Sequence, residues 1–104
     1  MDITIQFVQT EISEKAEKII REKLEKSGKK FDWVIRADVF FKKEKSPVNK
    51  GHICEIRLSL PGPPLFASAN ESSFENAADE AIHDMEVLLK KKKDRLNAKD
   101  KNTW

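Results

Sequence analysis

The sequence predicts an α+β domain with the element order β-α-β-β-β-α, in which two helices pack on one face of a four-stranded, mostly antiparallel sheet. Alternating apolar residues mark four extended segments, and apolar residues at helical spacing mark two longer ones. A chain of 104 residues has room for one hydrophobic core, not for two. We therefore expect a single domain over residues 1–96, followed by a frayed basic tail over residues 97–104.

The first strand and the first helix are predicted from the start of the chain. Apolar and polar residues alternate over Ile3–Val8, which is typical of a half-buried strand. A helix is expected from Glu14 to Ser27, because Ser13 suits the N-cap and Gly28 suits the end. The apolar stripe of this helix consists of Ala16, Ile19, Ile20 and Leu24.

Three further strands are predicted in the middle of the chain. The first covers Trp33–Lys43, and Ile35, Ala37, Val39 and Phe41 share one of its faces. A polar connection over Lys43–Gly51 suits a hairpin and leads into a strand over His52–Leu60. The turn Pro61–Pro64 then separates this strand from a last one over Leu65–Asn70.

The second helix has the clearest start signal in the sequence. Ser73 precedes an apolar-periodic run, and the segment Ser72–Glu75 is typical of a capping box. We expect the helix to continue to about Leu96. Its apolar positions are Phe74, Ala78, Ala81, Ile82, Met85, Leu89 and Leu96.

Composition argues against a membrane protein, an exported protein and an enzyme. No apolar run is long enough to span a bilayer, and the first residues do not resemble a secretory signal. The single cysteine, Cys54, excludes an internal disulfide and is expected to be buried in a strand. His52 and His83 have no nucleophile or second ligand nearby, and His83 is expected on the helix surface. We therefore expect a cytoplasmic protein without catalytic residues, metal, cofactor or small-molecule substrate.

Basic residues gather in two places although the net charge is only +2. Residues 14–30 contain seven bases and four acids, and residues 90–101 contain seven bases and two acids. Two helices on one face of a sheet would bring both groups to one side, which favours a polyanionic partner. Lys92 continues the apolar stripe, so its stem is expected at the edge of the core.

The aromatic residues do not add a base-reading signal to this pattern. Phe40 and Phe66, like the other phenylalanines, are assigned mainly to core packing, and Trp33 to packing at a strand edge. The sequence therefore predicts recognition of the phosphates and shape of folded RNA, and not stacking on its bases.

With these elements placed, the sequence resembles the ribosome hibernation promoting factors. This family is also called the ribosome-associated translation inhibitors or ribosomal subunit interface proteins, and the resemblance is to its short form. No single motif is diagnostic, but the order and spacing of several segments match. These segments are Ile3–Phe7, Ile20–Lys26, Phe31–Asp32, Glu55–Gly62, Leu65–Ala67, Phe74–Ile82 and Leu89–Arg95.

The resemblance implies a function that involves no catalysis. Such proteins bind the small ribosomal subunit in the channel used by messenger and transfer RNA, and they silence idle ribosomes under stress. Longer members carry a C-terminal dimerisation domain, which is not expected here, and a monomer is favoured without the oligomeric state being fixed. The residues that the resemblance places against ribosomal RNA are Lys23, Lys26, Lys29, Lys90, Lys91, Lys93 and Arg95.

Two alternatives stay open from the sequence. Val87 and Leu88 put apolar surface on the last helix, which would suit a protein-interaction or regulatory module. The α-β-β-β-α portion also has the element order of a general double-stranded RNA-binding domain. Salt dependence, and a comparison of duplex RNA with small ribosomal subunits, would separate these readings.

Overall fold

The computed structural model describes residues 1–45 and 50–101, with side chains described as far as Leu96. Its elements follow the predicted order β-α-β-β-β-α, which confirms the fold class. Their bounds are β1 Asp2–Val8, α1 Glu14–Lys30, β2 Arg36–Lys43, β3 His52–Ser59, β4 Leu65–Glu71 and α2 Phe74–Lys101. The predicted hairpin between β2 and β3 includes residues 46–49, which lie outside the described residues, as do residues 102–104 of the predicted tail.

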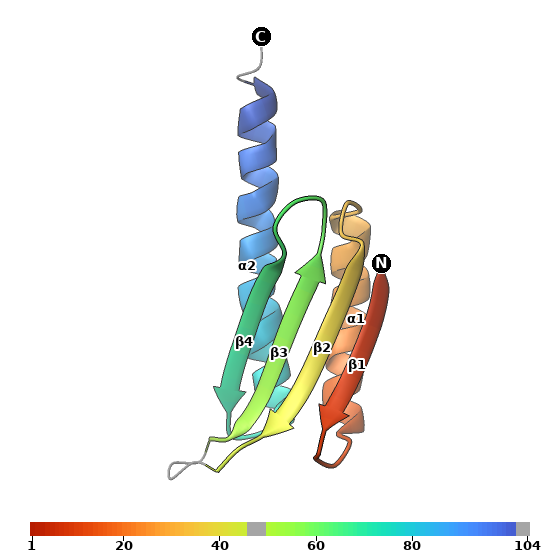
Figure 1. Ribbon diagram of the computed structural model, residues 1–104, viewed down its shortest axis with the longest axis vertical. Helices are drawn as coiled ribbons and strands as arrows, with labels where there is room; N and C mark the ends of the chain where they lie inside the picture. Colours follow the sequence, from red (N-terminus) through yellow and green to blue (C-terminus); the bar gives the residue numbers. More distant parts are fainter. Residues whose placement is uncertain (46–49, 102–104) are drawn as a thin grey trace.

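The four strands form one sheet in the order β1-β2-β3-β4 (Figure 1). β1 pairs with β2 in parallel, from Asp2 opposite Arg36 to Val8 opposite Lys42. The other two pairings are antiparallel, so the sheet is mixed but mostly antiparallel, as predicted. A parallel pair needs a crossover between its strands, and α1 supplies it.

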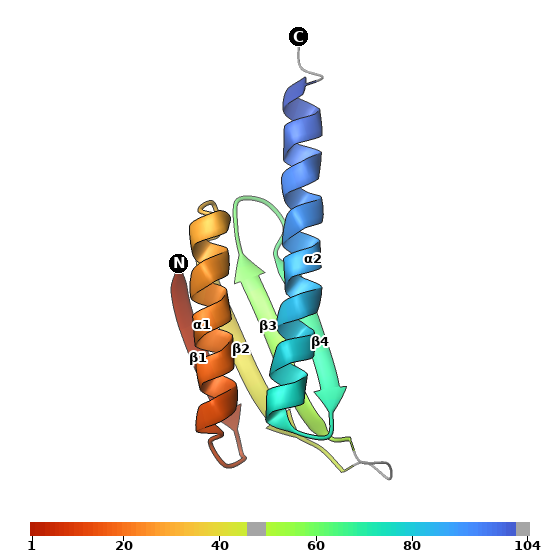
Figure 2. The same ribbon diagram turned by 180° about the vertical axis from the view of Figure 1, so that it is seen from behind.

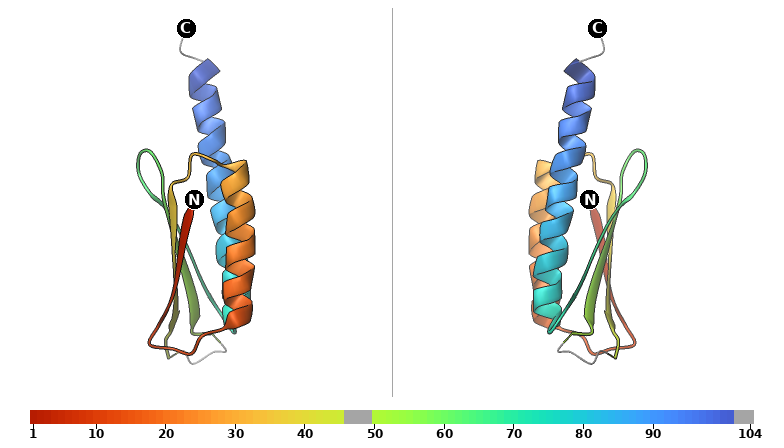
Figure 3. Two further views of the ribbon diagram at one scale, coloured as in Figure 1. Left: turned by 90° about the vertical axis from the view of Figure 1, so that its right-hand side faces the viewer. Right: turned by 90° about the vertical axis from the view of Figure 1, so that its left-hand side faces the viewer.

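Both helices lie side by side on the same face of the sheet, which gives the molecule two layers (Figures 2 and 3). The core fills the space between the layers. The strands contribute alternate residues such as Val39 and Ile56, while the helices contribute residues at helical spacing such as Ile20 and Met85. Cys54 is buried in this core, as predicted.

The start of β2 differs from the prediction. The strand was expected from Trp33, but it begins at Arg36, because a turn holds the preceding residues. In this turn the Val34 N–H donates to the Phe31 carbonyl (3.1 Å), and the rings of Phe31 and Trp33 meet edge to face. Val34 is therefore buried, whereas Ile35, expected on the same face as the buried Ala37, is 59% exposed.

Both helices run further than predicted. α1 was expected to end at Gly28 but continues to Lys30, where the Phe31 N–H donates to the Ser27 carbonyl (2.7 Å). Gly28 instead allows a close contact with the start of the chain, since a Cβ at this position would lie 2.9 Å from Met1 Cε. α2 was expected to end near Leu96 but continues to Lys101 and projects beyond the sheet (Figure 1).

The predicted helix starts are confirmed by their caps. Ser13 Oγ accepts a hydrogen bond from the Ala16 N–H (3.2 Å). Ser73 Oγ accepts one from the Asn76 N–H (3.1 Å). Each hydroxyl satisfies a donor that the first turn of a helix cannot satisfy by itself. These caps place the starts of α1 and α2 at the same end of the domain (Figure 2).

Candidate nucleic-acid interface

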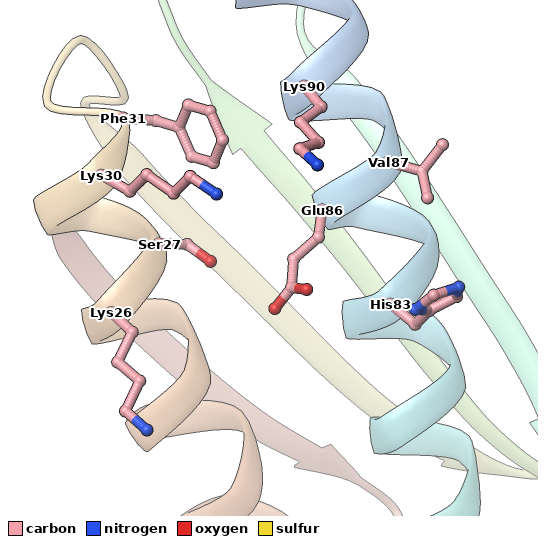
Figure 4. A pocket seen from close by; sticks show the side chains of 8 residues that line it. All are labelled: Lys26, Ser27, Lys30, Phe31, His83, Glu86, Val87 and Lys90. Atoms are coloured by element: carbon pink, nitrogen blue, oxygen red, sulfur yellow. The ribbon is translucent and has the colours of Figure 1, made fainter.

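A groove runs between α1 and α2 on the outer side of the helix layer, with a volume of about 290 Å³ (Figure 4). Residues from both helices and from the cap of α1 line it. They are Lys26, Ser27, Lys30, Phe31, His83, Glu86, Val87 and Lys90. We call this set the interhelical groove. It contains three lysines and one glutamate, so positive charge is in excess.

Helical spacing explains why these side chains meet. On α1, Lys26 and Lys30 are four residues apart and therefore lie on one flank of the helix. On α2, His83, Glu86 and Lys90 follow one another at spacings of three and four, so they lie on one side of the helix and border the groove. Glu86 points toward α1, whereas the His83 ring points away from it (Figure 4). The buried residues Ser27 and Phe31 form the floor, because they continue the core-facing stripe of α1.

Two lysines from different helices approach the same aromatic ring. The Nζ atom of Lys30 lies 5.6 Å from the centroid of the Phe31 ring, and that of Lys93 lies 5.8 Å from it. Each such contact contributes roughly 0.5–1 kcal/mol at an exposed site. The contacts draw two like charges toward one point, where a bound anion would relieve their repulsion.

Glu86 is the acidic residue of the groove. Its carboxylate points from α2 into the space between the helices (Figure 4). None of the ion pairs among the described residues involves this carboxylate. Glu86 therefore lowers the positive potential of the groove without cancelling any one lysine by direct contact.

The structure brings together only some of the seven residues predicted to contact RNA. Lys26 and Lys90 line the groove, and Lys93 contacts its floor at Phe31. Lys23 lies on the same flank of α1, but its Nζ atom is 3.1 Å from Asp79 Oδ1, so a carboxylate already neutralises it. Lys29 borders a separate shallow depression beside Met1.

The remaining two predicted residues lie on the other flank of α2. Lys91 and Arg95 share a helical stripe with Asp84, and Glu80 is the next residue on that side. The pKa of Glu80 is raised by the neighbouring Glu71 carboxyl of β4, so this flank lies near β4. Lys91 and Arg95 therefore lie apart from the interhelical groove, because consecutive residues on a helix project in different directions. The contact of the seven residues with RNA stays a prediction.

Sequence reasoning left Lys30 and His83 out of the predicted site. Although Lys29 and Lys30 both follow Gly28, the family resemblance pointed to Lys29 and passed over Lys30. The spacing of four from Lys26 was the signal that could have placed it. His83 is exposed on α2, as predicted, but the groove between the helices gives this surface position a role that its own element does not reveal.

The groups that could support other chemistry are accounted for by packing. Burial in the sheet raises the pKa of the Cys54 thiol to about 12, so this residue is not an activated nucleophile. Among the described residues, no group of three His, Cys, Asp or Glu side chains could hold a metal ion. In the same part of the chain, no helix is long and apolar enough to cross a bilayer.

With this geometry in place, comparison with known proteins gives the family. A model of the family described as Sigma 54 modulation protein / S30EA ribosomal protein matches residues 3–97, and the chain belongs to this family. The resemblance predicted from the sequence is thereby confirmed. No curated protein matches the chain.

Solved structures show the same fold. A ribosomal subunit interface protein from Coxiella burnetii matches with a TM-score of 0.74 and 23% identity, over 89% of this chain and 98% of that chain. The N-terminal domain of Thermus thermophilus Protein Y matches with a TM-score of 0.70 and 20% identity, over 88% of this chain and 98% of that chain.

Proposed function

We propose that this protein binds the small ribosomal subunit and silences translation by occupying the channel for messenger and transfer RNA. Membership of a family whose description names a ribosomal protein supports ribosome binding. The names of the two similar structures, a ribosomal subunit interface protein and Protein Y, agree with it. In this proposal the protein acts by bulk and position and makes or breaks no covalent bond.

The observation that carries the proposal is the convergence of Lys30 and Lys93 on the Phe31 ring, beside Lys26 and Lys90. Three lysines from two helices line one groove, and a fourth, Lys93, contacts its floor at Phe31. Such an array suits the closely spaced phosphates of folded RNA, which it would contact without reading sequence. Lys91 and Arg95, on the far flank of α2, would make a second contact, whereas Lys29 lies apart from both.

The experiment is sedimentation of the protein with small ribosomal subunits over a salt series. If about four phosphates are neutralised by the groove, the slope of log affinity against log salt is roughly −3 to −4. Substitution of Lys26, Lys30 and Lys90 by Glu should release the protein at moderate salt. Its matched control replaces Lys15, Lys18 and Lys43 by Glu, which are exposed lysines outside the groove. Equal release of both triple variants would refute the groove as the contact surface.

The structure bears on the two alternatives. A protein-interaction surface at Val87 and Leu88 is small, because Leu88 packs against the core and only Val87, at 41% exposure, faces outward. A general duplex-RNA binder would shift plain duplex RNA and ribosomal subunits at similar concentrations. The proposed factor should prefer the subunits, and a gel-shift comparison decides between them.

A further inference from the structure

The face of the sheet that carries neither helix contains a depression of about 350 Å³. Figure 1 looks onto this face. The outward side chains that line the depression come from three strands, and they are Phe40, Glu55, Arg57, Phe66 and Ser68. Its volume falls within the range of sites that hold small ligands. The sequence assigned both of these phenylalanines to the core, so the structure corrects that assignment.

Strand register brings these side chains together. Arg57 of β3 lies directly opposite Phe66 of β4, and Phe40 of β2 lies opposite Glu55 of β3. Successive side chains of a strand point to opposite faces, so these residues point outward while their neighbours fill the core. Phe66 is 63% exposed, which is high for an aromatic side chain in a sheet.

Arg57 is the free cation of this depression. The carbon at the centre of its guanidinium group lies 5.5 Å from the centroid of the Phe66 ring. In the described part of the chain, no ion pair includes this guanidinium. The guanidinium of Arg57 thus lies over the Phe66 ring without a direct ion pair to any described residue, and Asp38 is its cross-strand neighbour on β2.

The nearby carboxylates are already occupied by other cations. Asp38 Oδ1 lies 2.9 Å from Arg36 Nη2. Glu55 Oε1 lies 2.7 Å from Lys42 Nζ. Asp38 and Glu55 thus each have a partner of their own, and no direct ion pair among the described residues takes up the charge of Arg57.

These features favour a flat, polar, negatively charged occupant over an apolar protein surface. An apolar partner would have to desolvate the guanidinium and both ion pairs around the two rings. An unpaired nucleobase instead stacks on an aromatic ring or on a guanidinium plane, and its phosphate meets the free positive charge. The charge and the shape of the depression both match this class of ligand.

We propose that the open face of the sheet binds an unpaired base of a single-stranded nucleic acid. The base stacks on the Arg57–Phe66 pair, and Phe40 bounds the other side of the site. Ser68 and Glu55 supply hydrogen-bonding groups at the edge of the base. This site lies on the opposite side of the domain from the interhelical groove, so it does not rest on the proposed ribosome contact.

The test measures binding of the full chain to a fluorescent RNA of about eight adenosines by anisotropy. The reference ligand is an abasic strand of the same length and charge, because stacking requires bases whereas phosphate contacts do not. The wild-type chain should bind the adenosine strand more tightly. Phe66→Ala should weaken that binding about 5- to 100-fold while leaving the abasic strand unaffected, and Phe66→Tyr should keep the preference for bases.

Three controls make the result specific. Ile35→Ala removes an apolar side chain of similar exposure outside the depression, and it should change nothing. Lys26→Glu with Lys90→Glu changes the opposite side of the domain and should keep the base preference. Arg57→Gln tests the same site independently of any effect of Phe66→Ala on folding, and it should reduce the preference for bases.

Two results would overturn the proposal. One is equal binding of the adenosine and abasic strands by the wild-type chain. The other is self-association of the protein that Phe66→Ala abolishes, which would assign this face to a second copy of the chain. Neither result changes the outcome of the sedimentation experiment. Failure of the base-binding proposal can therefore be distinguished from failure of the proposed ribosome contact.

Discussion

Lys23 of α1 and Asp79 of α2 form an ion pair across the helix layer, with 3.1 Å between Nζ and Oδ1. In the described part of the chain it is the one ion pair that joins the two helices. The side chains remain 46% and 52% exposed, so solvent screens their attraction. The pair therefore sets the charge of this end of the groove more than it sets the stability of the domain.

Breaking this pair should change binding in opposite ways depending on the residue removed. Asp79→Asn frees the Lys23 ammonium and removes a negative charge, so ribosome binding should tighten. Lys23→Ala leaves the Asp79 carboxylate without its ammonium partner, so binding should weaken. Either change should cost less than about 1 kcal/mol of unfolding free energy, measured by urea denaturation. Equal ribosome affinity of both variants would contradict an electrostatic effect of this pair.

Glu86→Gln should strengthen binding at the interhelical groove. The substitution keeps the size of the side chain and removes the negative charge that points between the helices (Figure 4). An exposed charge interaction of about 1 kcal/mol corresponds to roughly fivefold tighter binding at low salt. The measurement is affinity for small ribosomal subunits at low and high salt. The gain should shrink as salt rises, and a gain that persists at high salt would contradict an electrostatic cause.

The carboxylate of Glu75 should make the free energy of unfolding decrease as the pH falls into the acidic range. Hydrogen bonds from its own backbone N–H and from the hydroxyls of Ser13 and Ser73 hold the pKa of Glu75 below its ordinary value of 4.5, against a smaller opposing effect of burial. Since the folded state lowers this pKa, the carboxylate stabilises the fold fully above 4.5. That contribution is lost as the pH falls through the lower folded-state pKa. Thermal unfolding followed from neutral to acidic pH measures the loss.

Two variants isolate this carboxylate from other acid effects. Glu75→Gln should unfold with a shallower dependence on pH below 4.5 than the wild-type chain. Ser13→Ala removes both the cap of α1 and the hydroxyl that donates to Glu75 Oε1 (3.1 Å), and should cost about 1 kcal/mol at neutral pH. An unchanged pH profile in Glu75→Gln would assign the acid sensitivity to other groups.

The sequence allowed the fold to be predicted where local patterns and packing agree. Ser13 and Ser73 mark helix starts by a hydrogen bond that depends only on the next three residues, and both were placed correctly. Helix ends depended on distant contacts. Gly28 looks like a terminator locally, but it lies against Met1, and Lys30 stays helical because Phe31 closes the last turn.

The binding surfaces were harder to predict because they depend on which flank of an element meets its neighbour. Lys90 and Lys91 are adjacent in sequence, yet only Lys90 lines the groove. Phe66 is a large apolar residue of the kind that usually lies in a core. It lies instead opposite Arg57, on the face of the sheet without helices. The flank of α2 that meets α1 requires the pairing of elements that are far apart in the chain. For Phe66, by contrast, alternation with Leu65 and Ala67 along β4 was the signal that could have placed it on the outer face.

The two-layer arrangement has a consequence for simultaneous occupancy. The Cα positions extend only 18 Å along the shortest axis. The interhelical groove lies on one broad side of the domain, and the depression lined by Phe66 lies on the other. Ligands at the two places could not collide, but neither could they touch each other through the protein. A single flexible strand would have to wrap around the rim at β1 or β4 to reach both. Two separate strands would instead be bridged, with this domain as a thin spacer between them.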